Sequence, residues 1–580
     1  MHTIANADRT EIETSNVSAN TLWVAANVNG EVDLFTTTDA FMNISTLNEP
    51  SDVDTGIPAA DFTRNQAFYD LVIEADANDN LVVGGVDLFR STDNGANWSQ
   101  ISKWSNNNNL NALGVSLVHA DQHSMIFRPG SGNGNKVVFG TDGGVFYSDD
   151  ITMAKSGSSG ATTNISSRNK DYNTVQFYYG AIDKSGGTDD LTGGTQDNGT
   201  QFKLNATAGA NGFSDTFGGD GGYTEIDNGG TYMIQSYPRN NHRFISYPSL
   251  STRYYITAIK DGLSADGSFI NEAALDTNLD IFYSNSSTST PTFSIERTSN
   301  FVAGTGGIVN TSLTNALLNA SPTAFKVSPF TGGSTKLFVG LTNSTLLRID
   351  TANGSPTWNN ITGGSFVGSI SDIEFGQNES EIFVTMHNYG VTSIWFTTDS
   401  GANWSSKEGN LPDLPVKCIL QNPLIPKELI IGTELGVWAT ADYTIANPVW
   451  VQSYNGISDV TVVDLDVRTS DNVILATTHG RGLFTSQFTS TPLGIDDNAI
   501  VNNSIKVFPT VSNGEFSILS KNSLGKVEMS LFTITGQKVY TTTFELTNIE
   551  KSFNLSLSSG LYLIKIKGDN FEGTKRVIIK

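Results

Sequence analysis

Short apolar runs, separated by turns rich in Gly, Asn, Asp and Ser, recur along the first 488 residues. Each unit reads as an apolar strand, a turn, a second strand, and then a turn that carries Asp, as in LVVGGVDLFRSTD around Asp93. Other copies end at Asp39, Asp150, Asp350, Asp399, Asp442 and Gln487. Successive copies are about 43 to 57 residues apart, which leaves room for four short strands with tight turns, except between Asp150 and Asp350, where the signature fades although strand-like stretches continue. The pattern predicts an all-β chain built from repeated small sheets.

Two octapeptides make the repeat more specific: STDNGANW from Ser91 and TTDSGANW from Thr397. Both read [ST]-x-D-x-G-x-x-W. The Asp can accept hydrogen bonds from amides of its own turn, the Gly can adopt positive φ, and the Trp can pack on the next strand. We therefore predict structural, non-catalytic roles for Asp93, Gly95, Trp98, Asp399, Gly401 and Trp404.

These octapeptides resemble Asp-box (BNR) repeats, which mark the sialidase, sortilin and family 74 xyloglucanase types of β-propeller. The resemblance implies a multi-blade β-propeller over residues 1–488, with the Asp-boxes on the outer rim, away from the central site. At this period the segment would hold about nine or ten blades, in one propeller or in two.

The pattern changes after Gln487. A polar stretch, TSTPLGIDDNAIVNN, precedes segments with alternating apolar and polar residues, such as KVEMSLFTI and LYLIKIK, the period of half-buried strands. From Ile505 on the chain has 10 Lys and Arg against 6 Asp and Glu, whereas the remainder has 24 against 52. We predict a linker at 489–504 and a small β-sandwich domain at 505–580.

This tail resembles the type A C-terminal sorting domain of Bacteroidota type IX secretion cargo. The resemblance rests on Pro509, Asn513-Gly514, Thr535 to Val539, Ser559 to Tyr562, and the basic end Lys575 to Lys580. It implies export across the outer membrane by the type IX machinery, followed by surface attachment or release. Such cargo first enters the periplasm through a signal peptide. The stretch MHTIANADRTEIETSN has no apolar h-region, so we expect the native start to lie upstream.

Composition and charge limit the classes of partner that the protein could bind. The formal charge of −24 argues against nucleic acid, because phosphate binding needs a basic surface. There is no run of about 18 apolar residues that could span a membrane. The single cysteine, Cys418, cannot form an intrachain disulfide, and its apolar surroundings predict a core position. No cofactor is predicted, while a bound calcium or other divalent ion stays open.

The stretch HADQH, from His119, is the most suggestive for chemistry. On a strand, alternation would place His119, Asp121 and His123 on one face. Two imidazoles and a carboxylate could bind a metal or form an acid–base cluster. The preferred interpretation is a polar cluster that lines the channel of the propeller.

Two Gly-rich turns, GGTQDNGT and GGDGGY, present Asp197, Asn198 and Asp220. Carboxylates and amides on rigid turns suit sugar hydroxyls, although tight turns need the same residue types. Near the end of the repeat region, His479 and Arg481 could bind an anion or simply form a hairpin. We list all five as candidate ligand-binding residues.

The stretch TDGGVFY, from Thr141, partly matches a stretch that holds a catalytic Asp in family 74 enzymes. The resemblance implies a catalytic role for Asp142, with Asp372 as the candidate second acid. An inverting glycosidase needs two carboxyl groups about 6.5–9.5 Å apart. The expected function is therefore that of a secreted or surface protein that acts on glycans, of the xyloglucanase type. The alternative is a non-catalytic propeller that binds glycan or protein.

Overall fold

The computed structural model describes residues 3–130, 132–258, 266–288, 292–453, 456–457, 459–490, 505–521, 523–533, 537–568 and 572–580. The all-β prediction is confirmed: helical structure in these ranges is limited to short 3-10 turns. They are η1 (Asn108–Ala112), η2 (Ile151–Met153), η3 (Ala161–Thr163) and η4 (Thr305–Gly307). No helix in the described ranges is long and apolar enough to cross a membrane.

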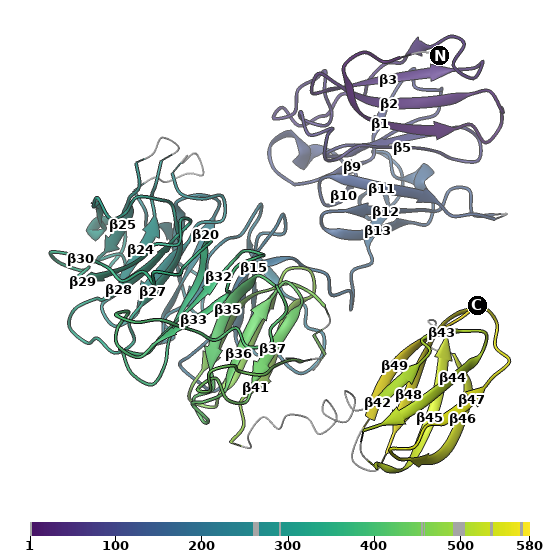
Figure 1. Cartoon of the computed structure of the whole chain (residues 1–580). Coiled ribbons are helices and arrows are strands. Elements are labelled where there is room, and N and C mark those ends of the chain that lie inside the picture. The colour runs from purple at the N-terminus through teal and green to yellow at the C-terminus, as the bar shows by residue number, and fades with distance from the viewer. Residues whose placement is uncertain are drawn as a thin grey trace. The chain divides into compact units, whose positions relative to one another are not determined.

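The chain divides into two compact units (elements labelled in Figure 1). Unit 1 comprises Met1–Asn319 and Leu475–Phe484, and unit 2 comprises Ala320–Ile474 and Thr485–Lys580. Most of the predicted linker, and Thr535 and Gly536 of the predicted sorting motif, lie outside the described residues.

Unit 1 contains six four-stranded antiparallel sheets in its described residues, each pairing strands in chain order. The first three are β1 (Ala7–Thr14), β2 (Leu22–Val28), β3 (Glu31–Thr37), β4 (Ser45–Thr46); β5 (Val72–Ala75), β6 (Leu81–Gly84), β7 (Leu88–Ser91), β8 (Ser99–Gln100); and β11 (Gln122–Phe127), β12 (Val137–Thr141), β13 (Gly144–Ser148), β14 (Ile165–Ser167). A short parallel pair, β9 (Ser102–Lys103) with β10 (Ser116–Leu117), lies between them in sequence.

The next three sheets of unit 1 are β15 (Phe177–Ile182), β16 (Leu191–Thr195), β17 (Thr200–Lys203), β18 (Ser214–Phe217); β19 (Thr224–Ile226), β20 (Tyr232–Tyr237), β21 (Asn241–Ser246), β22 (Arg253–Tyr255); and β23 (Ala273–Asp276), β24 (Ile281–Asn285), β25 (Ile295–Ser299), β26 (Val309–Leu313).

Unit 2 continues the series with β27 (Pro322–Val327), β28 (Leu337–Leu341), β29 (Leu346–Asp350), β30 (Thr357–Asn360); β31 (Ile370–Phe375), β32 (Ile382–Met386), β33 (Ile394–Thr397), β34 (Ser405–Ser406); and β35 (Val416–Gln421), β36 (Leu429–Thr433), β37 (Gly436–Thr440), β38 (Trp450–Ser453). The series closes with a three-stranded sheet of β39 (Val462–Arg468), β40 (Val473–Thr478) and β41 (Gly482–Gln487).

Neighbouring sheets pack face to face. Contacts join the first strands of successive sheets, namely β1 with β5, β5 with β11, β15 with β19, β27 with β31, β31 with β35, and β35 with β39. Apolar cores fill the space between sheets: Trp23, Leu34 and Phe89 share one between the first two sheets, and Phe338, Ile373 and Val384 share one in unit 2. Strands buried on both faces explain why their sequences read as continuous apolar runs rather than as alternating ones.

The C-terminal region of unit 2 consists of two sheets around a separate core. A three-stranded sheet has the order β42 (Ile505–Phe508), β44 (Glu515–Ser520), β47 (Lys551–Asn554), and a five-stranded sheet has the order β43 (Val511–Ser512), β49 (Glu572–Ile579), β48 (Gly560–Lys567), β45 (Gly525–Thr533), β46 (Lys538–Leu546). Side chains from both sheets, including Phe516, Leu531 and Ile564, are buried in one cluster. The alternating pattern of the sequence thus corresponds to half-buried strands.

Candidate functional site

The Asp of each octapeptide closes its own turn. Asp93 Oδ1 accepts hydrogen bonds from Ser91 Oγ at 2.8 Å and Asn97 N at 2.8 Å, while Oδ2 accepts one from Asn97 Nδ2 at 2.7 Å. Asp399 makes the same three bonds with Thr397 and Asn403. Hydrogen bonds from Asn97 and Asn403 hold the pKa of both carboxyls below the usual range, at about 2 for Asp399.

A third turn has the same network without glycine. Asp39 accepts from Thr37 Oγ1 at 2.9 Å, Asn43 N at 2.8 Å and Asn43 Nδ2 at 2.7 Å. Phe41 occupies the position of Gly95 and Gly401, with φ at 66°. All three turns connect the third strand of a sheet to the fourth, whereas the contacts between successive sheets run through first strands. The hydrogen bonds of these three carboxylates described here are all made within their own turns.

The Trp of each octapeptide ties its turn to the preceding sheet. Trp98 Nε1 donates to Asn48 O at 2.8 Å, just beyond β4, and Trp404 Nε1 donates to Ile361 O at 3.0 Å, just beyond β30. Both indoles pack against the apolar core between their sheet and the one before it.

The HADQH stretch differs from the strand prediction. β11 begins only at Gln122, and Asp121 has φ at 63°, so His119 and Asp121 lie in the loop before the strand. A register shift between Gln122 and Ser124 makes His123 a bulge residue. Bulges re-aim side chains, so His123 is not held by simple alternation.

The same bulge recurs near the start of first strands in other sheets. Register shifts of this kind place Tyr178 in β15, Thr323 in β27, Ser371 in β31 and Lys417 in β35 at the position of His123. Five sheets therefore share a re-aimed side chain at this end of the first strand, whereas β5, β19 and β23 pair without such a shift.

Asp142 is held from two sides. Its Oδ1 lies 2.5 Å from His123 Nε2, and Tyr69 OH donates to Oδ2 at 3.0 Å. The Tyr69 and His123 rings meet edge to face with centroids 4.8 Å apart. The hydrogen bond with Asp142 raises the pKa of His123, against the lowering effect of burial. Burial and the charge of Asp142 raise the pKa of the Tyr69 hydroxyl, which stays a donor.

Asp70 adds a buried carboxyl that the sequence did not single out. It is completely buried, and neither of its oxygens accepts a hydrogen bond from any residue that the structure describes. Burial, with the neighbouring Asp121 charge, raises its pKa to about 9. Burial also raises the pKa of Asp121, and the charge of Asp142 adds to this. A proton on Asp70 lets it donate to Asp121, since two ionised carboxylates in this position would repel.

The hairpin between β16 and β17 contacts His119 and Asp142. His119 Nε2 lies 3.0 Å from Asp197 O, and Asn198 Nδ2 donates to Asp142 O at 3.0 Å. Asp197 N donates to Asp220 Oδ1 at 3.0 Å. Burial, with the charges of Asp220 and Asp142, raises the pKa of Asp197 to about 7, and burial raises that of Asp220. Both carboxyls are half-buried, within reach of solvent.

Tyr178 and His479 extend this side of the site. Tyr178 OH donates to Gln196 Oε1 at 3.0 Å, and its ring lies 5.1 Å from that of His479. His479 Nδ1 lies 3.2 Å from Phe177 O. The Arg481 backbone N–H donates to Thr478 Oγ1 at 3.1 Å and its side chain is exposed.

Most of the predicted residues thus meet in unit 1. The contacts bring together residues predicted as catalytic, channel-lining and ligand-binding: His119, Asp121, His123, Asp142, Asp197, Asn198 and Asp220, with His479 joined through Tyr178. We call Asp70, Asp121, Asp142, Asp197 and Asp220 the acidic cluster. Sequence reasoning missed Tyr69 and Asp70, although they directly precede the first strand β5 as His119 and Asp121 precede β11. Comparing what precedes each first strand would have found them.

Asp372 belongs to unit 2, apart from this set of contacts. Its Oδ2 accepts a hydrogen bond from Ile419 N at 2.9 Å, which links β31 to β35, and its Oδ1 accepts one from Ile373 N at 2.7 Å. Burial raises its pKa to about 6, with Lys326 acting in the opposite direction. Its role as a second catalytic acid stays a prediction.

In the described ranges, no group of three or more His, Cys, Asp or Glu side chains that could hold a metal ion is found, and a bound divalent ion stays a prediction. Cys418 is buried, as predicted.

Comparison with known proteins identifies the tail. Residues 506–580 match the family model described as the secretion system C-terminal sorting domain. This domain supports export of the chain by type IX secretion to the cell surface, and it implies interaction with the type IX machinery. A search of curated proteins finds no match.

Proposed function

We propose that the meander sheets up to residue 488 are blades of Asp-box β-propellers, exported by type IX secretion, and that the acidic cluster is their glycan site. Contacts between first strands, apolar cores between successive sheets, and Asp-boxes between third and fourth strands support the propeller. The assignment of the site rests on the hydrogen bond from Asn198 Nδ2 to Asp142 O, which joins Asp142 to the Asp197–Asn198 turn.

The chemistry that suits this site best is glycoside hydrolysis by a carboxyl pair. Asp197, with its pKa raised to about 7, can hold a proton near neutral pH and act as general acid. Asp142, oriented by Tyr69 and His123, is the partner that activates water. Asp197 is a better partner for it than Asp372, because Asp372 already accepts two backbone hydrogen bonds in unit 2. Asp220 and Asn198 would hold sugar hydroxyls.

One observation favours the alternative, glycan binding without turnover. Both oxygens of Asp142 already have partners in Tyr69 and His123, an arrangement that could orient a sugar without moving a proton. Raised carboxyl pKa values also occur in structural networks.

The experiment measures release of reducing ends from xyloglucan and mixed-linkage β-glucan by the full chain. Asp142→Asn and Asp197→Asn should each lower turnover at least about 100-fold. Asp215→Asn, an exposed carboxylate of β18, is the matched control and should be unchanged. Saturable binding that both Asn variants weaken, without turnover, would select the alternative. If the chain shows no turnover and no binding, the proposed glycan site is wrong.

A further inference from the structure

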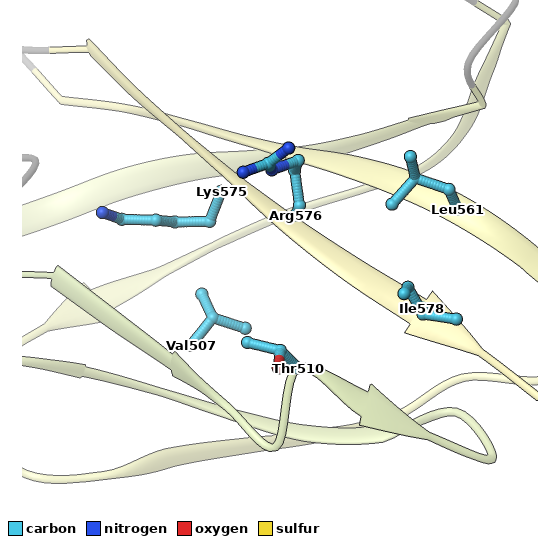
Figure 2. A pocket seen from close by; sticks show the side chains of 6 residues that line it. All are labelled: Val507, Thr510, Leu561, Lys575, Arg576 and Ile578. Atoms are coloured by element: carbon cyan, nitrogen blue, oxygen red, sulfur yellow. The ribbon is translucent and has the colours of Figure 1, made fainter. Parts of the chain in front are cut away.

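The sorting domain carries a groove at the border of its two sheets. It has a volume of about 460 Å³ and is lined by Val507, Thr510, Leu561, Lys575, Arg576 and Ile578. Figure 2 shows Val507 and Thr510 on one side, facing Lys575, Arg576 and Ile578 of β49. Two of the aliphatic side chains are well exposed, Leu561 at 39% and Ile578 at 45%.

The strand β49 has an open backbone edge at this groove. Along its whole length it pairs with β48, but its other neighbour, β43, covers only Ile578 and Ile579. Ile578 N donates to Thr510 O, so its N–H points away from β48. Because backbone groups alternate between the two sides of a strand, Thr574 and Arg576 also point theirs to the open side. Across the groove, β42 is an edge strand of the other sheet.

Two basic side chains, those of Lys575 and Arg576, belong to the open edge of β49. Lys575 and Arg576 form no ion pair and no side-chain hydrogen bond within the described part of the chain. Lys575 is half-buried and shares a strand face with the buried Val577 and Ile579. An inward charge on an edge strand discourages indiscriminate pairing with other strands. A partner strand that carries a carboxylate can still pair with this edge, because the carboxylate neutralises the charge.

We propose that β49 receives an extended segment of the secretion machinery as an added β-strand, with its carboxylates on the face of Lys575 and its aliphatic side chains on the opposite face, beside Arg576, Leu561 and Ile578. In this mode main-chain hydrogen bonds supply affinity and alternate side chains supply specificity. Thr574 and Arg576 provide the main-chain groups, and Leu561 and Ile578 provide the apolar contacts. A lipid headgroup would use the two cations but none of the outward amides.

The test uses the full chain and the blocked peptide VEVDVT as probe, with VKVKVT as its charge-reversed match. VEVDVT should bind and slow hydrogen exchange at the Thr574 and Arg576 amides. Thr574→Pro removes an outward N–H for which the described part of the domain shows no acceptor, a substitution that edge strands tolerate, and should weaken binding at least tenfold. Lys575→Glu with Arg576→Glu should do the same.

The control is Lys521→Glu with Lys551→Glu, which makes the same change in charge on exposed side chains away from the groove. It should bind VEVDVT normally and be exported normally, whereas the Lys575/Arg576 variant should stay in the periplasm. Equal binding of VKVKVT, undiminished binding by Thr574→Pro, or protection of these amides by phosphatidylglycerol vesicles or by self-association instead of the peptide would overturn the proposal.

Discussion

The imidazole Nε2 of His123 lies 2.5 Å from Oδ1 of Asp142, with His123 in β11 and Asp142 in the turn between β12 and β13 of the same sheet. The pair fixes Asp142 at the point where the β16–β17 hairpin arrives. The hydrogen bond with Asp142 raises the pKa of His123. A measured pKa of His123 therefore shows whether this hydrogen bond is present in the site.

Replacing Asp142 by Asn should lower the pKa of His123 toward its ordinary value of about 6.5. Titration of the imidazole followed by NMR measures this, with Asp215→Asn as a control that leaves the pKa where it was. In the wild-type chain the pair stabilises the fold fully below about pH 6.5 and loses its effect as pH rises through the folded-state pKa. A pKa unchanged by Asp142→Asn would contradict the ion pair.

Asp70→Asn should stabilise the chain in a pH-dependent way. The folded-state pKa of Asp70 is about 9, far above that of the unfolded chain, so the folded state binds the extra proton between about pH 4 and pH 9. Wild-type stability therefore falls across that window relative to Asp70→Asn, whose amide stays neutral. Urea unfolding should show a larger advantage for the variant at pH 8 than at pH 5, by at most about 1.4 kcal/mol per pH unit. An advantage that shrinks with rising pH would refute the buried acid.

Gly143→Ala should displace His119. A Cβ at Gly143 would lie 2.3 Å from His119 Cγ and 2.4 Å from its Cβ, too close for the imidazole to stay in place. We expect loss of the His119–Asp197 contact, seen as a changed His119 ring resonance, and a loss of glycan affinity. Gly212→Ala, where an added Cβ meets no atom within 4 Å, is the matched control. An unchanged His119 resonance would count against the packing described.

The two Asp-box glycines should differ in their tolerance of alanine. Both have positive φ, but a Cβ at Gly401 would lie 2.8 Å from Ile361 Cβ and 3.2 Å from its carbonyl oxygen, whereas at Gly95 it would meet the end of the Leu47 side chain. We expect Gly401→Ala to cost about 2–4 kcal/mol and Gly95→Ala about 1–2 kcal/mol. Thermal unfolding measures both.

The control for the glycine pair is Gly364→Ala, where an added Cβ meets nothing within 4 Å. It should unfold at the wild-type temperature. Equal losses at Gly95 and Gly401 would mean that the turn conformation, rather than the neighbour, sets the cost.

Many strands could be predicted because they are short apolar runs ended by Gly, Asn or Asp, and the tail because its residues alternate, whereas β1 (ADRTEIET) and the two-residue β4 are not such runs. The Asp93 and Asp399 turns were also accessible, since all their bonds are local. The acidic cluster was not, because it depends on which loops of different sheets meet. Asp142 and Asp197 were candidates separately, 55 positions apart, but nothing in the pattern joined them. The positive φ of Asp121 and the bulge at His123 also broke the alternation used to group them.

Asp70 illustrates a further limit. A Tyr-Asp pair before a strand carries no motif, and the buried carboxyl of Asp70 can be recognised only when the neighbouring loop brings Asp121 beside it.

The most direct measurement is hydrogen exchange of the full-length Asp142→Asn chain with and without a xyloglucan oligosaccharide. Because we expect this variant to turn over little or no substrate, exchange in it reports occupancy of the site. The account predicts that residues 119–123 and 196–198, which lie in different sheets, become protected together and at the same ligand concentration. Protection confined to unit 2, or none in either segment at saturating oligosaccharide, would contradict it.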